Sequence, residues 1–492
     1  MSHSIMWKQP KYRSRKRFLP LVLVVILLLN IYFLWFSPIA HTPLPIRQGK
    51  LWRNLHALLE KHAPQCSSPD LRGASAGTPR FDANDESSRR NYIVNSDDIQ
   101  QPLQIAHDGF VHDMQELKSD RAYNPRTKGI VSAAGGTYLP TFLVTLRVLR
   151  RTESKLPVEL FVKDYAEYEP YICEIVLPQL NAKCIVLSDV LSTLDGSRSE
   201  YPIEHFQIKS FAILFSSFEK LIWMDADILP LHDPAKLLNS EPFSSAGLVT
   251  WPDFWSNTAS PLYFNVSRQP DLPLNARQAT EAGVFLVSKK THYMTLLLSA
   301  YYNYHGPSYY YPLLDQGAPG EGDKDTFIQA ATALGEKFYT VSEPVVDLGH
   351  PDRWNQGIIG AAMLQADPME DYALTRRGKW RVKDPEVAKA ARGFFIHSYS
   401  PEFNAGGDLL GEKSRSKDGN PTRLWTDSKE ALERFGYDAE KVVWEEAKTV
   451  SCTLEHAFDA WKSKSGLCEG VQKHWDAVFE DASAELPKFT TA

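Results

Sequence analysis

Cysteine pairs at metal-binding spacing are missing from this 492-residue sequence. The five cysteines include no C-x-x-C pair, which argues against a zinc site built from thiolates. An odd number of cysteines allows two disulfides and one free thiol. The shortest loops would pair Cys173 with Cys184 and Cys452 with Cys468, and the sequence alone leaves these pairings open.

Acidic residues are missing from positions 1–17, where all the charged residues are lysines and arginines. Because the whole chain has a formal charge of −6, the remainder is strongly acidic. An acidic body with a basic tip is not typical of a nucleic-acid-binding protein, so we expect no nucleic-acid partner. A content of 43% hydrophobic and 23% charged residues is typical of a globular protein.

Residues 18–36 form an apolar run long enough to span a bilayer core. Basic residues precede the run and Trp35 lies near its far end, as in a positive-inside anchor with an aromatic belt. The alternative is a cleaved signal peptide, which would have a shorter apolar run and a small-residue cleavage site. We predict a cytoplasmic tail over residues 1–17, a transmembrane signal anchor over 18–36 and a lumenal stem over 37–125.

Strands and helices alternate beyond the predicted stem. Apolar runs predict strands at 130–131, 156–162, 182–187 and 221–224, and apolar spacing predicts helices at 137–151 and 205–218. This alternation predicts an α/β fold with a parallel sheet, in which ligands bind at the carboxyl ends of the strands. We assign residues 126–404 to this domain, treat 248–264 as an aromatic, proline-rich loop and interpret 405–492 as a structural helical extension.

The stretch from 218 to 234 gives the clearest indication of chemistry. The buried strand Leu221–Met224 leads directly into Asp225, Ala226 and Asp227. The two carboxylates point the same way, and two unpaired like charges at the end of a buried strand would be costly. Mg²⁺ or Mn²⁺ would relieve that cost, because both bind carboxylate oxygens and share them with phosphate. The alternative is a turn with two solvated aspartates.

Candidate donor-binding residues lie near other predicted strand ends. Gly135 and Gly136 would let a ligand approach the start of a helix closely, although a tight turn explains them equally well. The sequence here is not G-x-G-x-x-G, so a dinucleotide is not indicated. Lys209, one helix before the aspartates, could reach a phosphate or stay in solvent.

Four further residues are candidates for the sugar side or the metal. Glu281 opens a strand beside small residues, and Asp323 lies in a glycine-rich turn. Either could line the sugar and act in catalysis, while Asp323 could instead cap a helix. His350 and His397 each end a short strand, so either could supply a nitrogen ligand to a metal.

Several stretches resemble the fungal Golgi α-mannosyltransferases that branch and extend cell-wall mannan and the outer chains of N-glycans. The resemblance covers roughly residues 126–400 with the order of the motifs kept. It rests on GIVSAAGGTYLPTFLVTLRVLR, LPVELFV, FQIKSFAILFSSFEKLIWMDADILPLHDP, LVTWPDFW, EAGVFLVSK and GEGDKDTF. The FQ-x-K and GEGDK segments are more similar to the α-1,2 branch-adding members than to the α-1,3 capping members.

The resemblance implies a GT-A fold with a Rossmann-like sheet and a single-pass type II anchor in the Golgi membrane, with the catalytic domain in the lumen. It also implies GDP-mannose as donor, a mannan or N-glycan acceptor, Mn²⁺ (or Mg²⁺) as cofactor and retention of the anomeric configuration. By that resemblance Asp225 and Asp227 hold the metal, His397 approaches the metal or the phosphate, and Lys209 lies near the donor.

Two positions depart from the pattern of that family. The strand expected to read E-S-G-Q reads Glu281-Ala282-Gly283-Val284, and Glu402 stands where a lysine is expected. The first departure bears on donor or acceptor specificity, and the second also bears on the role of His397. An α-1,3-mannosyltransferase, a transferase that uses a UDP-sugar and an inactive glycan-binding scaffold are the alternative functions.

Overall fold

The computed structural model describes residues 42–192, 203–318, 320, 322–351, 358–426 and 429–480. The predicted tail and signal anchor, residues 1–36, lie outside these ranges. Within the ranges, no helix combines the length and the apolar character needed to cross a bilayer.

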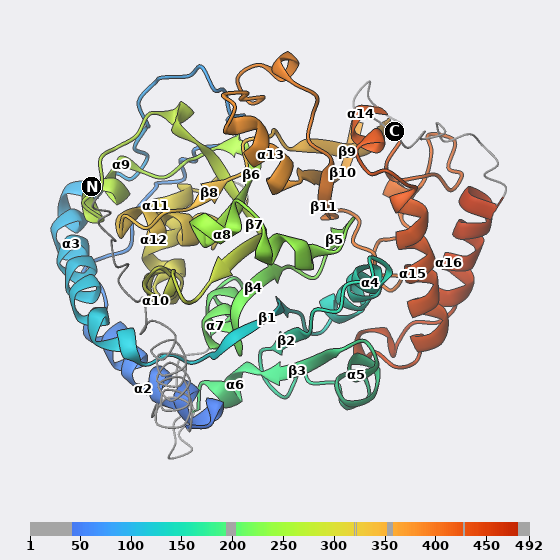
Figure 1. Ribbon diagram of the computed structural model, residues 1–492, viewed down its shortest axis with the longest axis horizontal. Coiled ribbons are helices and arrows are strands. Elements are labelled where there is room, and N and C mark those ends of the chain that lie inside the picture. The colour runs from blue at the N-terminus through green and yellow to red at the C-terminus, as the bar shows by residue number, and fades with distance from the viewer. Residues whose placement is uncertain are drawn as a thin grey trace, which may run out of the picture.

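A seven-stranded sheet runs through the middle of the molecule in the order β3-β2-β1-β4-β7-β6-β8 (Figure 1). Its first four strands are parallel, β4 and β6 pair antiparallel with β7, and β8 pairs parallel with β6. The bounds are β1 (Asn124–Ala133), β2 (Val158–Val162), β3 (Ala182–Val186), β4 (Phe218–Met224), β6 (Leu248–Ser256), β7 (Gln278–Ser288) and β8 (Tyr339–Thr340).

The mixed α/β class is confirmed, and the predicted parallel sheet is correct for β1 to β4. The loop predicted over 248–264 is wrong in its first half, because β6 is a strand whose residues lie against β7. Proline is rare inside strands, which made Pro252 look like part of a loop. The strand tolerates it because the pairing register of β6 shifts between Pro252 and Ser256.

A second, antiparallel sheet of four strands begins directly after the aspartate pair. Its order is β5-β11-β10-β9, with β5 (Ile228–Pro230), β9 (Val346–Pro351), β10 (Ile358–Ala366) and β11 (Gly393–His397). Since β4 ends at Met224 and β5 begins at Ile228, residues 225–227 link the two sheets.

Helices cover both faces of the large sheet. The helices between the parallel strands are α4 (Tyr138–Arg151) and α7 (Gln207–Phe215), both confirmed from the sequence, with the short α5 (Leu177–Gln179) and α6 (Leu187–Val190) beside β3. The others are α2 (Leu44–Lys61), α3 (Ser96–Asp113), α8 (Phe243–Ala246), α9 (Pro261–Val266), α10 (Tyr293–Tyr304), α11 (Tyr311–Asp315), α12 (Thr326–Ala333), α13 (Pro368–Thr375), α14 (Lys429–Glu433), α15 (Ala439–Leu454) and α16 (Leu467–Trp475).

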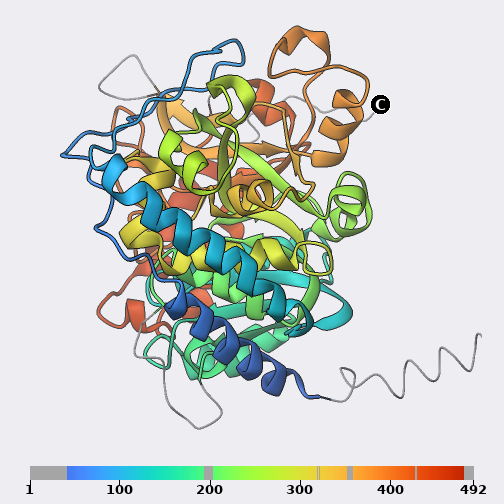
Figure 2. The same ribbon diagram turned by 90° about the vertical axis from the view of Figure 1, so that its left-hand side faces the viewer.

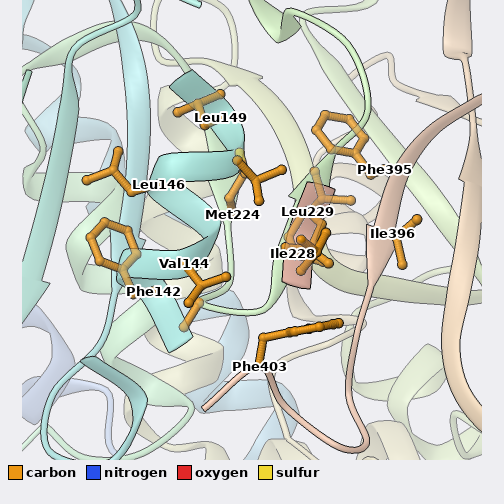
Figure 3. Close-up of a cluster of buried hydrophobic side chains, with 14 of the residues drawn as sticks. Phe142, Val144, Leu146, Leu149, Met224, Ile228, Leu229, Phe395, Ile396 and Phe403 are labelled. Carbon is orange, nitrogen blue, oxygen red and sulfur yellow. The ribbon is translucent and has the colours of Figure 1, made fainter. Parts of the chain in front are cut away.

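Two hydrophobic cores lie on opposite faces of the sheet, because side chains alternate along a strand. On β4, Ile222 and Met224 belong to the core that contains α4, while Leu221 and Trp223 belong to the core that contains α7 and α10. Figure 3 shows α4 packed against the end of β4, against β5 and near β11, through Phe142, Leu146, Leu149, Met224, Ile228, Leu229 and Phe395.

The described residues of the segment predicted as a stem are folded onto the domain. The helices α2 and α3 lie along one flank of the domain (Figure 2), and α2 buries Leu51, Leu55 and Leu59 in the same core as α7 and α10. Polar and proline-rich residues between the two helices gave no indication that these helices pack on the domain. The described residues from 44 onward are therefore part of the folded body.

The residues of the predicted C-terminal extension share a core with the large sheet. On the opposite flank from α2 and α3, α15 packs on α4 (Figure 1). Arg147 of α4 pairs there with Glu446 of α15 at 2.6 Å. Both disulfide pairings suggested by loop length are confirmed, Cys173 with Cys184 and Cys452 with Cys468, and Cys66 is free.

Candidate active site

The segment 225–227 is held between the ends of three strands. The Asp225 N–H donates to the carbonyl of Gly283 in β7 at 2.8 Å. The Ser398 N–H, directly after β11, donates to the carbonyl of Asp227 at 3.0 Å. Because both aspartates are tied through their backbone to rigid strands, their side chains have fixed positions at the carboxyl end of β4.

Asp225 is a half-buried carboxylate that accepts hydrogen bonds from two donors. Trp223, which lies on the same side of the strand, donates from its indole Nε1 to Oδ1 at 2.7 Å. Lys209 donates from Nζ to Oδ2 at 3.3 Å. Burial raises the pKa of Asp225 to about 6, even though the charge of Lys209 acts to lower it.

Lys209 lies in α7 and is only 8% exposed, so the solvated alternative does not apply. Its ammonium donates to the carbonyl of Ala282 at 2.9 Å and lies 3.2 Å from Asp323 Oδ2. Burial acts to lower the pKa of Lys209, but attraction to Asp225 and Asp323 outweighs it and raises the pKa above its ordinary value. Lys209 is therefore a permanent cation between two carboxylates.

His397 joins the second aspartate to Glu281. As the last residue of β11 it pairs with Ile228 of β5, which places its ring beside the aspartate loop. Its Nε2 lies 3.3 Å from Asp227 Oδ2 and its Nδ1 lies 3.1 Å from Glu281 Oε2. Burial acts to lower the pKa of His397, but the two carboxylates outweigh it and raise the pKa well above the ordinary value.

The pKa of Glu281 is shifted in the opposite direction. Burial acts to raise its pKa, but attraction to His397 and a hydrogen bond from the Gly283 N–H outweigh burial and lower the pKa to about 2. Glu281 is therefore an anion that holds the imidazolium of His397. The same strand supplies the Gly283 carbonyl to Asp225, so β7 orients both halves of the site.

A cavity of about 640 Å³ opens over these residues. Asp225, Asp227, Lys209, His397 and Gly135 line it, which brings together five residues predicted from the sequence. The sequence did not indicate several other lining residues, namely Tyr138, Phe161, Lys163, Glu167, Glu204, His205 and Phe206. Glu402, noted only as a departure from the family pattern, also lines the cavity and accepts a hydrogen bond from Thr141 at 3.1 Å.

The remaining predicted residues lie elsewhere. Glu281 and Asp323 are not among the residues of the described chain that line this cavity, and each contacts it through a neighbour, His397 or Lys209. The Asp323 side chain is not the cap of α12, whose first turn follows Asp325. His350 donates from Nε2 to the Lys413 carbonyl, 2.5 Å away, and does not line the cavity. Gly136 has a φ of 54°, which favours glycine in the turn before α4.

The donor set suits a hard divalent cation. Two aspartates and one imidazole face the cavity, and carboxylate oxygens outnumber the lysines along its wall. Burial is the main cause of the raised pKa of Asp225, and the charges of Asp227 and Asp323 raise that pKa further. Across the described residues, no three His, Cys, Asp or Glu side chains already converge as a metal site. Asp227 and His397 instead contact each other.

Comparisons with known proteins place this arrangement in a class. The family model described as "Mannosyltransferase putative" matches residues 127–278 and 273–367, which include the aspartate pair, Lys209 and Glu281. The chain is 32% identical over 430 residues to α-1,2-mannosyltransferase MNN21 of Candida albicans, covering 76% of this chain and 64% of that protein. It is also 32% identical to α-1,2-mannosyltransferase MNN2 of Saccharomyces cerevisiae, covering 62% of this chain and 58% of that protein.

These matches place the chain in a family of glycosyltransferases. More narrowly, the chain belongs to the family of fungal α-mannosyltransferases. It spans less than two-thirds of the length of the two relatives named above. Among solved structures it is similar to the glycosyltransferase GlyE of Streptococcus pneumoniae, with 14% identity over 66% of this chain and 64% of that chain. The TM-score of 0.32 is too low to support an argument from that structure.

Proposed function

We propose that this chain transfers mannose from GDP-mannose to a mannose-terminated glycan, forming an α-1,2 linkage with retention of configuration. The observation that carries the proposal is the pair Asp225 and Asp227 at the end of β4, facing a cavity beside the cations Lys209 and His397. The curated relatives named α-1,2-mannosyltransferases support the sugar and the linkage.

A GT-A fold is part of the proposal. Its support within this chain is the run of four parallel strands, β3-β2-β1-β4, followed by antiparallel strands, with the acidic pair at the carboxyl end of β4. Ligands of open α/β sheets bind at the carboxyl ends of the strands, and the cavity lies at the ends of β1, β2 and β4.

Asp225 and Asp227 would hold Mn²⁺ or Mg²⁺, and His397 would join them as a ligand by giving up one of its two ring protons when the ion binds. When bound, such an ion neutralises charge on the departing diphosphate. Lys209 keeps Asp225 in place and contributes a fixed positive charge close to the cavity. Glu281 keeps the ring of His397 directed at Asp227, which makes Glu281 a positioning residue in this proposal. Asp323 is likewise a positioning residue, because its carboxylate pairs with the ammonium of Lys209.

The cellular setting also belongs to the proposal. An anchor over residues 18–36 would place the described domain in the Golgi lumen, where mannan or N-glycan acceptors are elaborated. The two disulfides support an oxidising compartment, because disulfides persist in secretory lumens and are rare in the cytosol.

Product analysis tests the sugar and the linkage. The full-length chain, purified in a mild detergent, is incubated with Mn²⁺, a mannose-terminated oligosaccharide and either GDP-mannose or UDP-glucose. We expect one added mannose that is released by an α-1,2-specific mannosidase. A product resistant to that enzyme but sensitive to an α-1,3-specific one would change the linkage. A product formed only from UDP-glucose would overturn the donor, and glycan binding without any product would support an inactive scaffold.

A further inference from the structure

One end of the cavity is lined by residues that follow β2 and has no role yet in the proposed function. Its Asp227 end also holds Tyr138, whose pKa is raised first by the charge of Glu402 and further by burial and by Asp227. Its other end lies where β2 leaves the sheet, because Lys163 and Glu167 directly follow that strand and line the wall. The cavity therefore extends from the end of β4 to the end of β2.

Glu167 is held in one orientation at this second end. Its Oε2 accepts a hydrogen bond from the Lys163 N–H at 2.9 Å, and its own N–H donates to the Asp164 carbonyl at 3.2 Å. A Cβ atom at Gly135 would lie 2.3 Å from Oε2, so the carboxylate occupies the space left by the missing side chain. The absent Cβ of Gly135 therefore fixes where Glu167 lies in the wall.

The other oxygen of Glu167 is available to a ligand. Among the described residues, none forms a hydrogen bond or an ion pair with Oε1. The neighbouring carboxylate of Glu204 differs, because Lys163 Nζ donates to it at 2.8 Å. At this end of the cavity, Glu167 is thus the acceptor without a cation, and it is fixed by backbone contacts.

An exposed aromatic side chain lines the same cavity. Phe206 follows Glu204, the partner of Lys163, by two positions and is 54% exposed, which is unusual for a large apolar ring. Aromatic side chains in such positions stack on nucleic-acid bases, since every base has a π-face. A cavity that holds both a fixed carboxylate and an exposed ring is suited to a flat ligand with hydrogen-bond donors along one edge.

We propose that this end of the cavity binds the base of the donor nucleotide and that Glu167 selects guanine over uracil. The inference rests on the proposed function, which places the diphosphate at Asp225 and Asp227 and so leaves the β2 end for the base. Guanine presents N1–H and N2–H side by side, and a carboxylate accepts both. Uracil presents one N–H between two carbonyl oxygens, which would face the negative charge of Glu167.

Binding of three nucleotides tests the assignment. GDP, IDP, which lacks the 2-amino group, and UDP are titrated by calorimetry into the full-length chain in Mn²⁺. We expect wild type to bind GDP about tenfold more tightly than IDP, as for one hydrogen bond to a charged group, and UDP more weakly still. In Glu167→Gln the advantage of GDP over IDP should fall to about threefold or less. Glu174→Gln, a matched change at an exposed glutamate outside the cavity, should keep the tenfold ratio.

A second variant tests the same geometry without changing a charge. Gly135→Ala would place a methyl group against Oε2 and push the Glu167 carboxylate aside, so it should also reduce the ratio. Tenfold preference for GDP retained in Glu167→Gln and Gly135→Ala would overturn the base assignment and leave GDP binding intact. Loss of the preference in Glu204→Gln alone would also overturn it. Wild type that binds UDP and not GDP would overturn the proposed donor and this inference together.

Discussion

Removing the cation at position 209 should destabilise the protein measurably. Lys209 is buried between Asp225 and Asp323 and also donates to the Ala282 carbonyl. In Lys209→Met both carboxylates would lose their cation inside the protein, and breaking a buried ion pair in this way costs about 3 to 5 kcal/mol. With an unfolding entropy of about 2.1 cal/mol/K per residue and about 420 residues in the described ranges, the unfolding temperature should fall by about 3 to 6 °C.

The assay is thermal unfolding at pH 7.5 in EDTA, so that no divalent ion replaces the lost charge. The control is Lys462→Met, the same change at a lysine that is 69% exposed and pairs with Asp459 at the surface. Such an exposed pair contributes little to stability because solvent screens it, so the control should shift by about 1 °C or less. In the double variant Lys209→Met with Asp323→Asn, the fall in unfolding temperature should be smaller than the sum of the falls in the two single variants. A Lys209→Met protein that unfolds at the temperature of the control would refute the buried-cation argument.

Three further variants report on other parts of the structure. Burial raises the pKa of Glu440 to about 7, so the folded state binds a proton there more tightly than the unfolded chain. This stabilisation is complete below pH 4.5 and is lost as the pH rises through about 7, so the unfolding temperature of wild type should fall more between pH 5.5 and pH 8.5 than that of Glu440→Gln. Cys452→Ser with Cys468→Ser opens a loop with a sequence separation of 16, which should lower stability by about 3 kcal/mol and the unfolding temperature by about 3 °C. Glu281→Gln should release His397 and raise the Mn²⁺ concentration for half-maximal GDP release about 10-fold to 100-fold.

Each of these three has an outcome that contradicts it. Parallel pH curves for wild type and Glu440→Gln would show that another group controls stability in that range. An unchanged unfolding temperature after removal of the second disulfide, or after reduction of wild type with dithiothreitol, would remove the loop-closure argument. A Glu281→Gln variant with the Mn²⁺ dependence of Glu174→Gln, an exposed control, would separate Glu281 from the metal site.

Local patterns predicted the elements that surround the site. The apolar run before Asp225 and the helical spacing of residues 137–151 each report on nearest neighbours in the chain, and β4 and α4 formed where these patterns indicated. The pattern failed where pairing depends on a distant strand, as in β6, which is a strand because β7 lies beside it. It also gave no sign that α2 packs on the domain, because the leucines of α2 are buried by α7 and α10, which come much later in the chain.

Some residues of the site could be predicted from the sequence, and others could be found only from the fold. Asp225 and Asp227 stood out because two charges next to a buried strand conflict with simple burial. The contact of Lys209 with Asp323 joins residues 114 positions apart, and only the fold shows that both are buried partners of one network. Glu167 carried no signal at all, because its role depends on the space at Gly135, which no spacing along the chain encodes.

The most direct measurement is acceptor-stimulated release of GDP from GDP-mannose in Mn²⁺, compared between Asp227→Asn and Asp233→Asn. The two changes remove one carboxylate each from the same segment, but Asp233 only caps a short helical turn, which asparagine also does. The account predicts Mn²⁺-dependent release by wild type and Asp233→Asn, and release reduced by at least about 100-fold in Asp227→Asn. Asp227→Asn with wild-type release would contradict the central claim that the aspartate pair at the end of β4 is the catalytic metal site.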